Sequence, residues 1–443
     1  MGSPQLDPGE RRFTLVTPTD RRIMALALPA IATVAAEPLY DLTDAAILAH
    51  IGTTALAGAV VATSILLLIS AVFIFLMFAT TAAVSRLLAE GRPADAVRHG
   101  VSGSWFGLAA GTTIAAITVW FVGPLCAFWG TTGTTAEAAE AYLRISLLGI
   151  PAMLVTLAAT GYLRGTGTTT VPMWIAFGSV AVNLALEVIT VFGLGWGVEA
   201  SAASTVVAKW LAAGWSIRYL IVAARQHRVT LWPDRTEIGG VGRRGTPLFV
   251  RTLALRGTVS VAAGLVAHLG PAELAGFGIA FAIWSFLAFC ADGLEVAGQV
   301  LVAGELGAGD AAAARAMAAR ILTLAAGLGV VLCVVLLAVR TVVADGFSPD
   351  AQVTALAAAG LLWVAATQPV NAVVFALDGI LVGAGDLWAS AVVMAGAAAA
   401  ALPVWWAFGD RSAGIWAGLL VFMAARLVGM SVRWKFHRLD ADR

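Results

Sequence analysis

Residues 48–58 read LAHIGTTALAG and residues 266–276 read VAHLGPAELAG, so the two stretches agree at six of eleven positions across an offset of 218 residues. The same offset relates GYLRGTG at 161–167 to GILVGAG at 379–385. Alanine and glycine are abundant enough to produce one such match. Two gapless matches at one offset, far apart in the chain, instead indicate an internal duplication.

The composition around these repeats is that of an integral membrane protein. Of the 443 residues, 60% are hydrophobic and 12% are charged, and the mean hydropathy is +0.89. The apolar runs are long and do not alternate, so helices are expected rather than a β-barrel. The three cysteines lack metal-type spacing and are expected to act as small apolar side chains.

The apolar runs predict twelve spans, six in each half. They cover approximately 22–48, 55–88, 99–128, 138–163, 169–194, 198–224, 246–268, 274–306, 314–344, 351–381, 387–408 and 413–437. An even number of spans returns the chain to its starting side, so the halves insert in the same orientation. We therefore expect an all-α fold of two six-helix lobes related by a pseudo-two-fold axis along the membrane normal, with a central cavity between them.

This fold divides the chain into five parts. They are an N-terminal segment at 1–21, a first lobe at 22–224, a linker at 225–245, a second lobe at 246–437 and a tail at 438–443.

The arginines set the expected orientation. The loops on the side of the N-terminus carry most of them, with Arg164 and the stretch 426–443 counted there, whereas the alternate loops carry only Arg340 and Arg411. The positive-inside rule then places both termini in the cytoplasm and the protein in the plasma membrane. The first twenty residues hold no apolar core of signal-peptide length. The net charge of +1 says little about partners. We expect a monomer in the lipid bilayer with no nucleic-acid partner.

The first predicted span carries the stretch EPLYDLTDAAIL, whose acids Glu37, Asp41 and Asp44 share one face of a helix. A charge near the bilayer centre costs about 2.5 to 3.5 kcal/mol on insertion scales. Three acids therefore indicate a functional site, with the alternative that Asp44 reaches water at the outer end of the span. Pro29 and Pro38 each remove a backbone donor and are candidate hinges.

The fifth predicted span adds Asn183 and Glu187, which lie one turn apart on the same face. Their oxygens could hold a proton or Na⁺ beside the acids of the first span, and a hydrogen bond between packed helices is the alternative. Thr205 in the sixth span is a weaker candidate, because its hydroxyl could simply bond to its own helix backbone.

The second half has its own polar set in the eighth and tenth spans. Arg251 and Arg256 in the seventh span are candidate counter-ions for its acids. A deep tryptophan could stack on a cationic substrate, with packing as the alternative. To the substrate cavity we assign Asp41, Trp284, Asp292, Glu295, Gln299, Asn371 and Asp378.

From about residue 20 to 435 the chain resembles the multidrug and toxic compound extrusion (MATE) transporters, in the branch of DNA-damage-inducible protein F. The resemblance rests on ALPAIATVAAEPLYDLTDAAILAHIGTTALAG, on GYLRGTG followed by the fifth span, on FCADGLEVAGQ with GELGAGD, and on FALDGILVGAG. It implies that Asp44 is the near-essential acid of the first span and that Pro29 is the point about which this span bends.

The resemblance also implies roles in both lobes. Asn183, Glu187 and Thr205 would belong to a cation or proton network, and Asp292 and Asp378 would be second-lobe acids. Two positions depart from the family pattern, with Glu187 in place of the usual Asp and Gln299 where an acid is common; Glu295 is a candidate replacement for that acid. Asp41 lies outside the pattern.

The expected function is secondary antiport. An organic, cationic or amphipathic compound would leave the cell as H⁺ enters, with Na⁺ bound by Asp44, Asn183 and Glu187 as the alternative coupling ion. No other cofactor is expected, and no G-x-x-x-x-G-K-[ST] loop is present for ATP. The other readings are a lipid-linked precursor flippase, which calls for a more basic cavity, and an intramembrane transferase, which calls for an Asp-rich or His–Asp motif.

Overall fold

The computed structural model describes residues 17–436, except for the side chains of residues 37–39, 41, 42, 45, 49 and 235. Within that range every regular element is a helix. The α-helices are α1 (Pro18–Ile51), α2 (Thr53–Phe73), α3 (Phe75–Ala89), α4 (Pro93–Thr118), α5 (Val122–Phe128), α6 (Gly133–Ser146), α7 (Ile150–Gly165), α8 (Thr170–Glu187), α9 (Val198–Gln226), α10 (Arg235–Ala267), α11 (Pro271–Gly307), α12 (Ala311–Phe347), α13 (Ala351–Gly383), α14 (Leu387–Phe408) and α15 (Ser412–Phe436).

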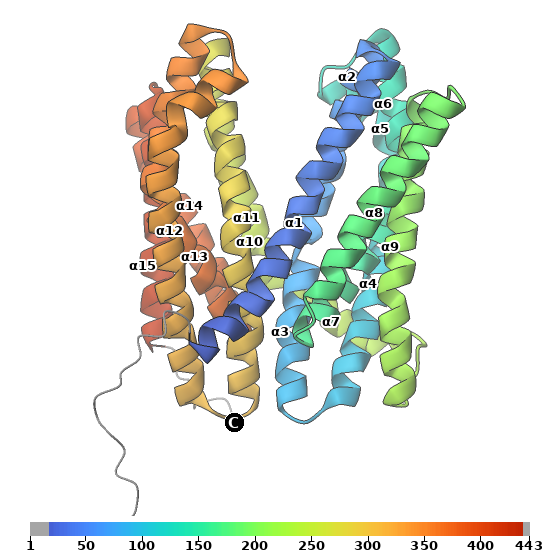
Figure 1. The fold of residues 1–443 in the computed structure, drawn as a ribbon, viewed down its shortest axis with the longest axis vertical. Coiled ribbons are helices and arrows are strands. Elements are labelled where there is room, and N and C mark those ends of the chain that lie inside the picture. The colour runs from blue at the N-terminus through green and yellow to red at the C-terminus, as the bar shows by residue number, and fades with distance from the viewer. Residues whose placement is uncertain (1–16, 437–443) are drawn as a thin grey trace, which may run out of the picture.

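These helices form two lobes. The pairs α2 with α3, α4 with α5 and α6 with α7 each make one span, so eleven spans follow α1 among the described residues. Figure 1 shows the first lobe, from α1 to α9, beside the second lobe, from α10 to α15, with the two diverging toward the top in a V. The expected twelve-helix, two-lobe fold is confirmed.

The duplication is visible in the backbone of the turns. Gly52 has a φ of 149° and Gly270, its equivalent at the offset of 218, has a φ of 136°. Gly167 and Gly385, another equivalent pair, both have a φ of 79°. Positive φ is a region that residues with a Cβ rarely adopt, so the same residue type is needed at the same turn in each half.

The repeated GYLRGTG and GILVGAG motifs mark a close helix crossing that occurs twice. A Cβ at Gly161 of α7 would lie 2.6 Å from the carbonyl oxygen of Met77 on α3. A Cβ at Gly379 of α13 would lie 2.1 Å from the carbonyl oxygen of Glu295 on α11. Met77 and Glu295 are themselves equivalent at the offset of 218, so the two lobes share this packing.

The lobes contact one another in the lower half of Figure 1, where the first half of α1 crosses the lower part of the second lobe. Ile23, Leu26 and Ala27 of α1 are buried in one cluster with Leu294 and Ala297 of α11. This cluster ties the first half of α1 to the second lobe, while the rest of α1 belongs to the first.

Polar links reinforce the same contact. Asp20 on α1 accepts two hydrogen bonds from Arg320 on α12, at 2.6 and 2.7 Å. Ser85 on α3 donates to the carbonyl oxygen of Val300 on α11 at 2.7 Å. The lobe contact therefore combines apolar packing with links that must break when the lobes separate.

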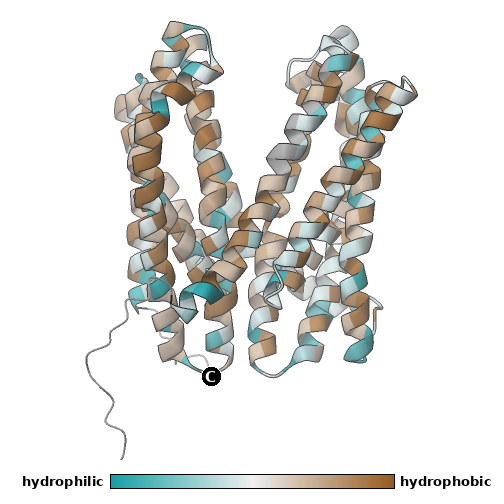
Figure 2. Cartoon of the chain, in the orientation of Figure 1, coloured by the Kyte–Doolittle hydropathy of each residue, from teal (hydrophilic) through white to brown (hydrophobic). Residues whose placement is uncertain are grey.

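The outer faces are apolar. Figure 2 shows hydrophobic residues along the middle of the helices and hydrophilic residues gathered toward their ends. Large side chains lie open on these faces, among them Trp120, Phe128 and Trp406, the last 91% exposed. Such surfaces fit lipid rather than water.

The linker between the lobes is shorter than the sequence predicts. Helix α9 ends at Gln226 and α10 begins at Arg235, so residues 235–245 of the predicted linker are helical. The apolar run covers only the part of α10 that is hydrophobic enough for lipid. The helix begins upstream of that part, after an N-cap residue. Asp234 provides the cap by accepting from the backbone N–H of Thr236 at 2.9 Å.

Candidate ion-coupling sites

The first cluster joins four helices of the first lobe around two carboxylates. Ser201 on α9 has its hydroxyl oxygen 2.7 Å from a carboxylate oxygen of Asp44 on α1 and 3.1 Å from one of Glu187 on α8. Tyr142 on α6 donates its hydroxyl to the other oxygen of Asp44 at 3.3 Å. All four side chains are buried. Asp44 thus faces the interior of the lobe rather than water at the end of its span.

A second group of two hydroxyls and an amide lies one helical turn along the same helices. Asn183 donates to the hydroxyl of Thr205 at 3.3 Å, and the hydroxyls of Tyr40 and Thr205 lie 2.6 Å apart. Asn183 and Thr205 are buried. Asp44 and Glu187 therefore meet at Ser201, while Asn183 and Thr205 are joined in a separate hydrogen-bonded group of the same lobe.

The helix that carries Glu187 changes its form directly after it. Residues Val188–Gly193 are π-helical, a form that is rare and concentrates at functional sites. One carboxylate oxygen of Glu187, Oε2, is buried without a hydrogen-bond partner. The site therefore keeps an open acceptor next to an irregular helix.

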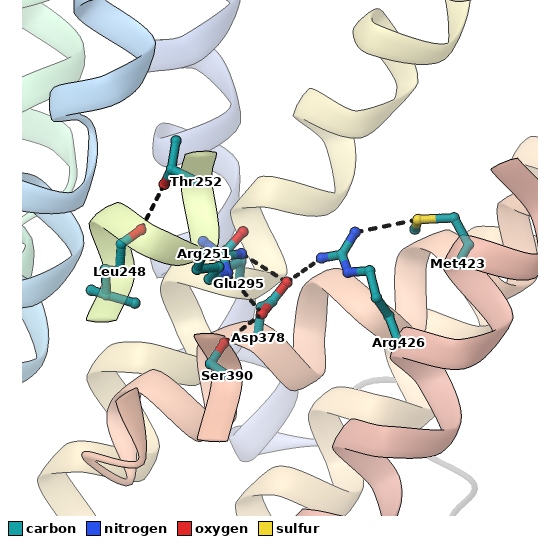
Figure 3. A network of polar contacts seen from close by, with 8 residues as sticks. All are labelled: Leu248, Arg251, Thr252, Glu295, Asp378, Ser390, Met423 and Arg426. Carbon is teal, nitrogen blue, oxygen red and sulfur yellow. Dashed lines mark hydrogen bonds and ion pairs between the residues drawn. The ribbon is translucent and has the colours of Figure 1, made fainter. Parts of the chain in front are cut away.

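The second cluster lies in the second lobe and is centred on Asp378 of α13 (Figure 3). Arg251 of α10 donates through Nε to Oδ1 of Asp378 at 3.1 Å and places a terminal nitrogen 2.7 Å from Oδ2. Arg426 of α15 also pairs with Oδ2, and Ser390 of α14 donates to Oδ1 at 3.1 Å. Asp378 is thus fully engaged by two guanidinium groups and a hydroxyl.

Glu295 on α11 is held more loosely beside this cluster. The nearest nitrogen of Arg251 lies 3.7 Å from its Oε1, which is too long for a hydrogen bond. That oxygen is buried without a hydrogen-bond partner. Glu295 therefore carries an acid group that its own lobe only partly compensates.

The other second-lobe candidates occupy separate surroundings. Asn371 donates to Thr367 at 3.4 Å, while its own amide oxygen has no partner. The Gln299 amide is buried with neither nitrogen nor oxygen bonded. The Trp284 indole packs edge-on against Phe281, with ring centroids 5.2 Å apart.

The family profile described as MatE matches this chain twice, over residues 29–189 and again over 247–406. The chain belongs to the MATE family. The two matched segments begin 218 residues apart, which agrees with the repeat and with the paired turns. MATE proteins are transporters, so the chain is not an enzyme and the transferase reading is set aside.

Relatives and solved structures support the family over nearly the whole chain. Protein DETOXIFICATION 44, chloroplastic, from Arabidopsis thaliana is 32% identical over 92% of this chain and 80% of its own length. DNA damage-inducible protein F from Escherichia coli is 24% identical over 96% and 94%. A crystal structure of MATE in the bent conformation superposes with a TM-score of 0.86, covering 96% of each chain at 19% identity. The chain is thus similar in fold to MATE transporters with two six-helix lobes.

Three residues of the MATE first-lobe cluster were missed in the sequence. Tyr40 stands four residues before Asp44 and could have been placed on its face by helical spacing. Tyr142 and Ser201 are two of several hydroxyl-bearing residues in their spans, and no periodic or charge signal distinguishes them from the others. Their place in the cluster comes from helix packing and not from any local pattern.

Two arginines that the orientation argument counts are buried in the protein. Arg164 and Arg426 were counted with the cytoplasmic loops and tail, but they are 3% and 1% exposed and lie within α7 and α15. Arg164 directly follows the predicted span 138–163, and Arg426 lies inside the predicted span 413–437. Arg426 therefore joins Arg251 as a counter-ion of Asp378.

Three predicted residues cannot be placed in either cluster. The side chains of Glu37, Pro38 and Asp41 lie outside the part of the chain that is described. Pro29 can be placed, and it leaves the carbonyl oxygen of Ala25 without its usual helical donor. Thr169 donates its hydroxyl to that oxygen at 3.3 Å, so the helix is supported from outside at this proline.

Asp292 is half-buried one turn from Glu295 on the same helix. Across the described residues, no group of three or more His, Cys, Asp or Glu side chains is arranged to hold a metal ion. The oxygen atoms at the first cluster come instead from two carboxyl groups and two hydroxyls.

Proposed function

We propose that this chain is a secondary antiporter that exports organic, cationic or amphipathic compounds in exchange for H⁺, with Asp44 and Glu187 as the proton-binding pair. The proposal goes beyond family membership in naming the coupling ion, the residues and the substrate class. One observation carries it: a single hydroxyl, that of Ser201, lies between two buried carboxyl groups.

The hydroxyl of a serine has one proton to donate. It can therefore donate to Asp44 or to Glu187 but not to both. The second contact becomes a hydrogen bond only when the other carboxyl group carries a proton and donates it to the serine oxygen.

Electrostatics favour the same conclusion. Two ionised carboxylates in a buried site repel each other strongly, because the interior screens charge poorly. In the described part of the chain their hydrogen-bond partners are hydroxyl groups. One proton shared by the pair relieves the repulsion, and loss of that proton changes the contacts that Asp44 makes to α8 and α9.

Helix α1 gives this change a route to the lobe contact. Its second half carries Asp44 within the first lobe, and its first half packs through Ile23 and Ala27 against α11 of the second lobe. Pro29 lies between these halves, next to the support from Thr169. A change at Asp44 can thereby alter the packing that holds the lobes together, as alternating access requires.

The test is transport in proteoliposomes with ethidium as the probe cation, driven separately by a pH gradient and by a Na⁺ gradient. We expect the pH gradient to drive uptake in the wild type and to fail in Asp44→Asn and Glu187→Gln. The matched control is Asp410→Asn, because Asp410 is an exposed acid paired with its neighbour Arg411.

Wild-type exchange in Asp44→Asn under a pH gradient would remove Asp44 from the coupling step. Transport that follows Na⁺ and ignores pH would assign the first cluster to Na⁺ instead, through the oxygens of Asp44, Asn183 and Glu187.

A further inference from the structure

The linker that joins the two lobes is held against the first lobe. The indole nitrogen of Trp105 on α4 donates to the carbonyl oxygen of Leu231 at 2.9 Å. Val229 packs against the apolar cluster that contains Leu220 of α9 and is also contacted by Trp105. Asp234 then caps α10. The linker is therefore fixed at three points, and the position of its exposed side chains is defined.

This attachment brings the linker back beside α9. A Cβ at Gly100 of α4 would lie 2.8 Å from the side chain of Leu220, so these two residues stand at the same height in the lobe. Trp105 lies five residues further along α4, which is about 7.5 Å closer to the middle of that helix. The carbonyl that Trp105 binds thus lies near the height of Leu220, and not beyond the end of α9 at Gln226.

The lipid-facing side of α9 carries two arginines near its end. In Figure 1, α9 lies at the edge of the first lobe that faces away from the second lobe. Leu211, Trp215 and Val222 are exposed on this helix at spacings of three to four residues or their multiples. Arg218 and Arg225 fall on the same stripe and are also exposed. Positive charge is thus interleaved with apolar side chains on one face.

These charges begin at the expected boundary of the hydrocarbon core. Helix α9 starts at Val198, and a core about 30 Å thick takes about 20 helical residues. A span of that length from Val198 ends next to Arg218. Trp232 in the linker is 81% exposed, and a tryptophan is favoured at this depth. Four exposed residues together form what we call the linker surface: Arg218, Arg225, Arg228 and Trp232.

No acid balances the arginines of the linker surface. Residues 200–233 contain neither Asp nor Glu. Asp234 follows directly, but its carboxylate accepts from the backbone of α10. Across the described residues the three arginines have no ion-pair partner, whereas Arg98 pairs with Asp95 at 2.8 Å. An arginine at the edge of the lipid without a counter-charge is unfavourable, so an anion from outside the chain would stabilise this surface.

We propose that the linker surface binds an anionic phospholipid of the adjoining leaflet. Guanidinium groups are suited to bind phosphate, and the surplus of positive charge favours a headgroup of net negative charge over a zwitterionic one. The occupant is a lipid rather than a soluble phosphate, because Arg218 lies between Trp215 and Val222 on the lipid-facing stripe. Binding here is independent of which ion couples transport.

Native mass spectrometry of the full chain in detergent measures this binding. The probes are dioleoyl phosphatidylglycerol, which is anionic, and dioleoyl phosphatidylcholine, which is zwitterionic. One basic residue near an anionic surface contributes about fivefold to the binding constant. We therefore expect the triple variant Arg218→Gln, Arg225→Gln, Arg228→Gln to bind phosphatidylglycerol at least about tenfold more weakly, and to bind phosphatidylcholine within about twofold of the wild type.

The matched control loses the same charge elsewhere. It combines Arg92→Gln, Arg98→Gln and Arg433→Gln, three exposed arginines that already pair with carboxylates. This control should keep its phosphatidylglycerol affinity within about twofold of the wild type, because its arginines are not available to the lipid.

Four results would overturn the lipid site. They are an unchanged phosphatidylglycerol affinity in the triple variant, an equal loss in the control, equal affinities of the wild type for the two lipids, and displacement of phosphatidylglycerol by soluble glycerol 3-phosphate. The last would assign the surface to a soluble phosphate compound.

The depth of the surface is tested separately in phosphatidylglycerol-containing nanodiscs. A bimane fluorophore is attached at Trp232→Cys in a chain whose three native cysteines are replaced by alanine. We expect a lipid with a nitroxide on its headgroup to quench this fluorophore more strongly than a water-soluble nitroxide does. The control position is Glu90→Cys, exposed in the turn after α3, where the order should be reversed. Stronger quenching of the Trp232→Cys label by the water-soluble probe would contradict the proposal.

Discussion

Replacing Ser201 by alanine should shift the proton equilibrium of the first-lobe cluster to higher pH. The Ser201 hydroxyl donates to an ionised carboxylate at 2.7 Å in one arrangement and at 3.1 Å in the other. Removing this donor destabilises the ionised state more than the protonated state, so the midpoint of proton release rises.

The size of the shift follows from the contacts. A hydrogen bond to a charged group contributes about 1.5 to 3 kcal/mol, and about 1.4 kcal/mol corresponds to one pH unit. Tyr142 still donates to Asp44 at 3.3 Å in the variant, so part of the stabilisation remains. We therefore expect a rise of about one pH unit, at the lower end of that range.

Infrared difference spectroscopy measures this without a substrate. The carbonyl stretch of a protonated carboxyl group is followed with pH in detergent-solubilised protein, and Glu187→Gln identifies the band by removing it. Ser204→Ala is the matched control, since Ser204 lies one turn further along α9, is buried, and contacts Thr190 at 3.5 Å but neither carboxylate. The shared-proton reasoning is refuted if the titration midpoint of Ser201→Ala falls, or stays within about 0.3 pH units of the wild type. This limit corresponds to roughly 0.4 kcal/mol.

Three further substitutions test the packing and the charges. Gly379→Ala forces a Cβ to within 2.1 Å of a backbone oxygen and should destabilise the fold by about 1 to 3 kcal/mol, which would lower the thermal midpoint of unfolding. The control Gly278→Ala, whose Cβ would have nothing within 4 Å, should not lower this midpoint. Arg426→Met leaves Asp378 with one guanidinium partner and should cost about 3 kcal/mol in chemical denaturation, at the low end for a broken buried pair; an unchanged midpoint would contradict the pairing. Hydrogen bonds from the side chain and backbone of Thr236 and from the backbone of Glu237 lower the pKa of Asp234. The cap is therefore fully formed above the ordinary Asp pKa and is lost as pH falls through the lowered value. Amide exchange at the first turn of α10 should report this pH dependence, and Asp234→Ala should abolish it.

The fold could be predicted from the sequence because the apolar runs that lipid requires and the internal repeat are both visible in the sequence. Apolar runs mark spans by length alone, and the offset of 218 residues reappears as paired turns at Gly52 and Gly270 and at Gly167 and Gly385. The helix boundaries were less well predicted where a helix extends beyond its apolar run into water. Helix α10 begins at Arg235, since a cap, and not hydropathy, decides where a helix starts.

Only some residues of the two clusters could be predicted from the sequence. Acids within a span are conspicuous, so Asp44, Glu187 and Glu295 could be found individually. A hydroxyl such as that of Ser201 is common in membrane helices, and an arginine such as Arg164 near a span end has the same sequence appearance whether it reaches water or turns inward. Only the packing of four helices decides which of these side chains meets an acid.

The two clusters differ in the groups that contact their acids. The hydrogen-bond partners of Asp44 and Glu187 are hydroxyls throughout the described part of the chain, so neutralising that pair requires an ion from outside. Asp378 has two arginines from its own lobe and needs none, and Glu295 lies 3.7 Å from one of them, Arg251. A duplicated scaffold whose crossing holds Met77 in one lobe and Glu295 in the other thus carries paired charges in the second lobe and carboxyl groups without a cation in the first.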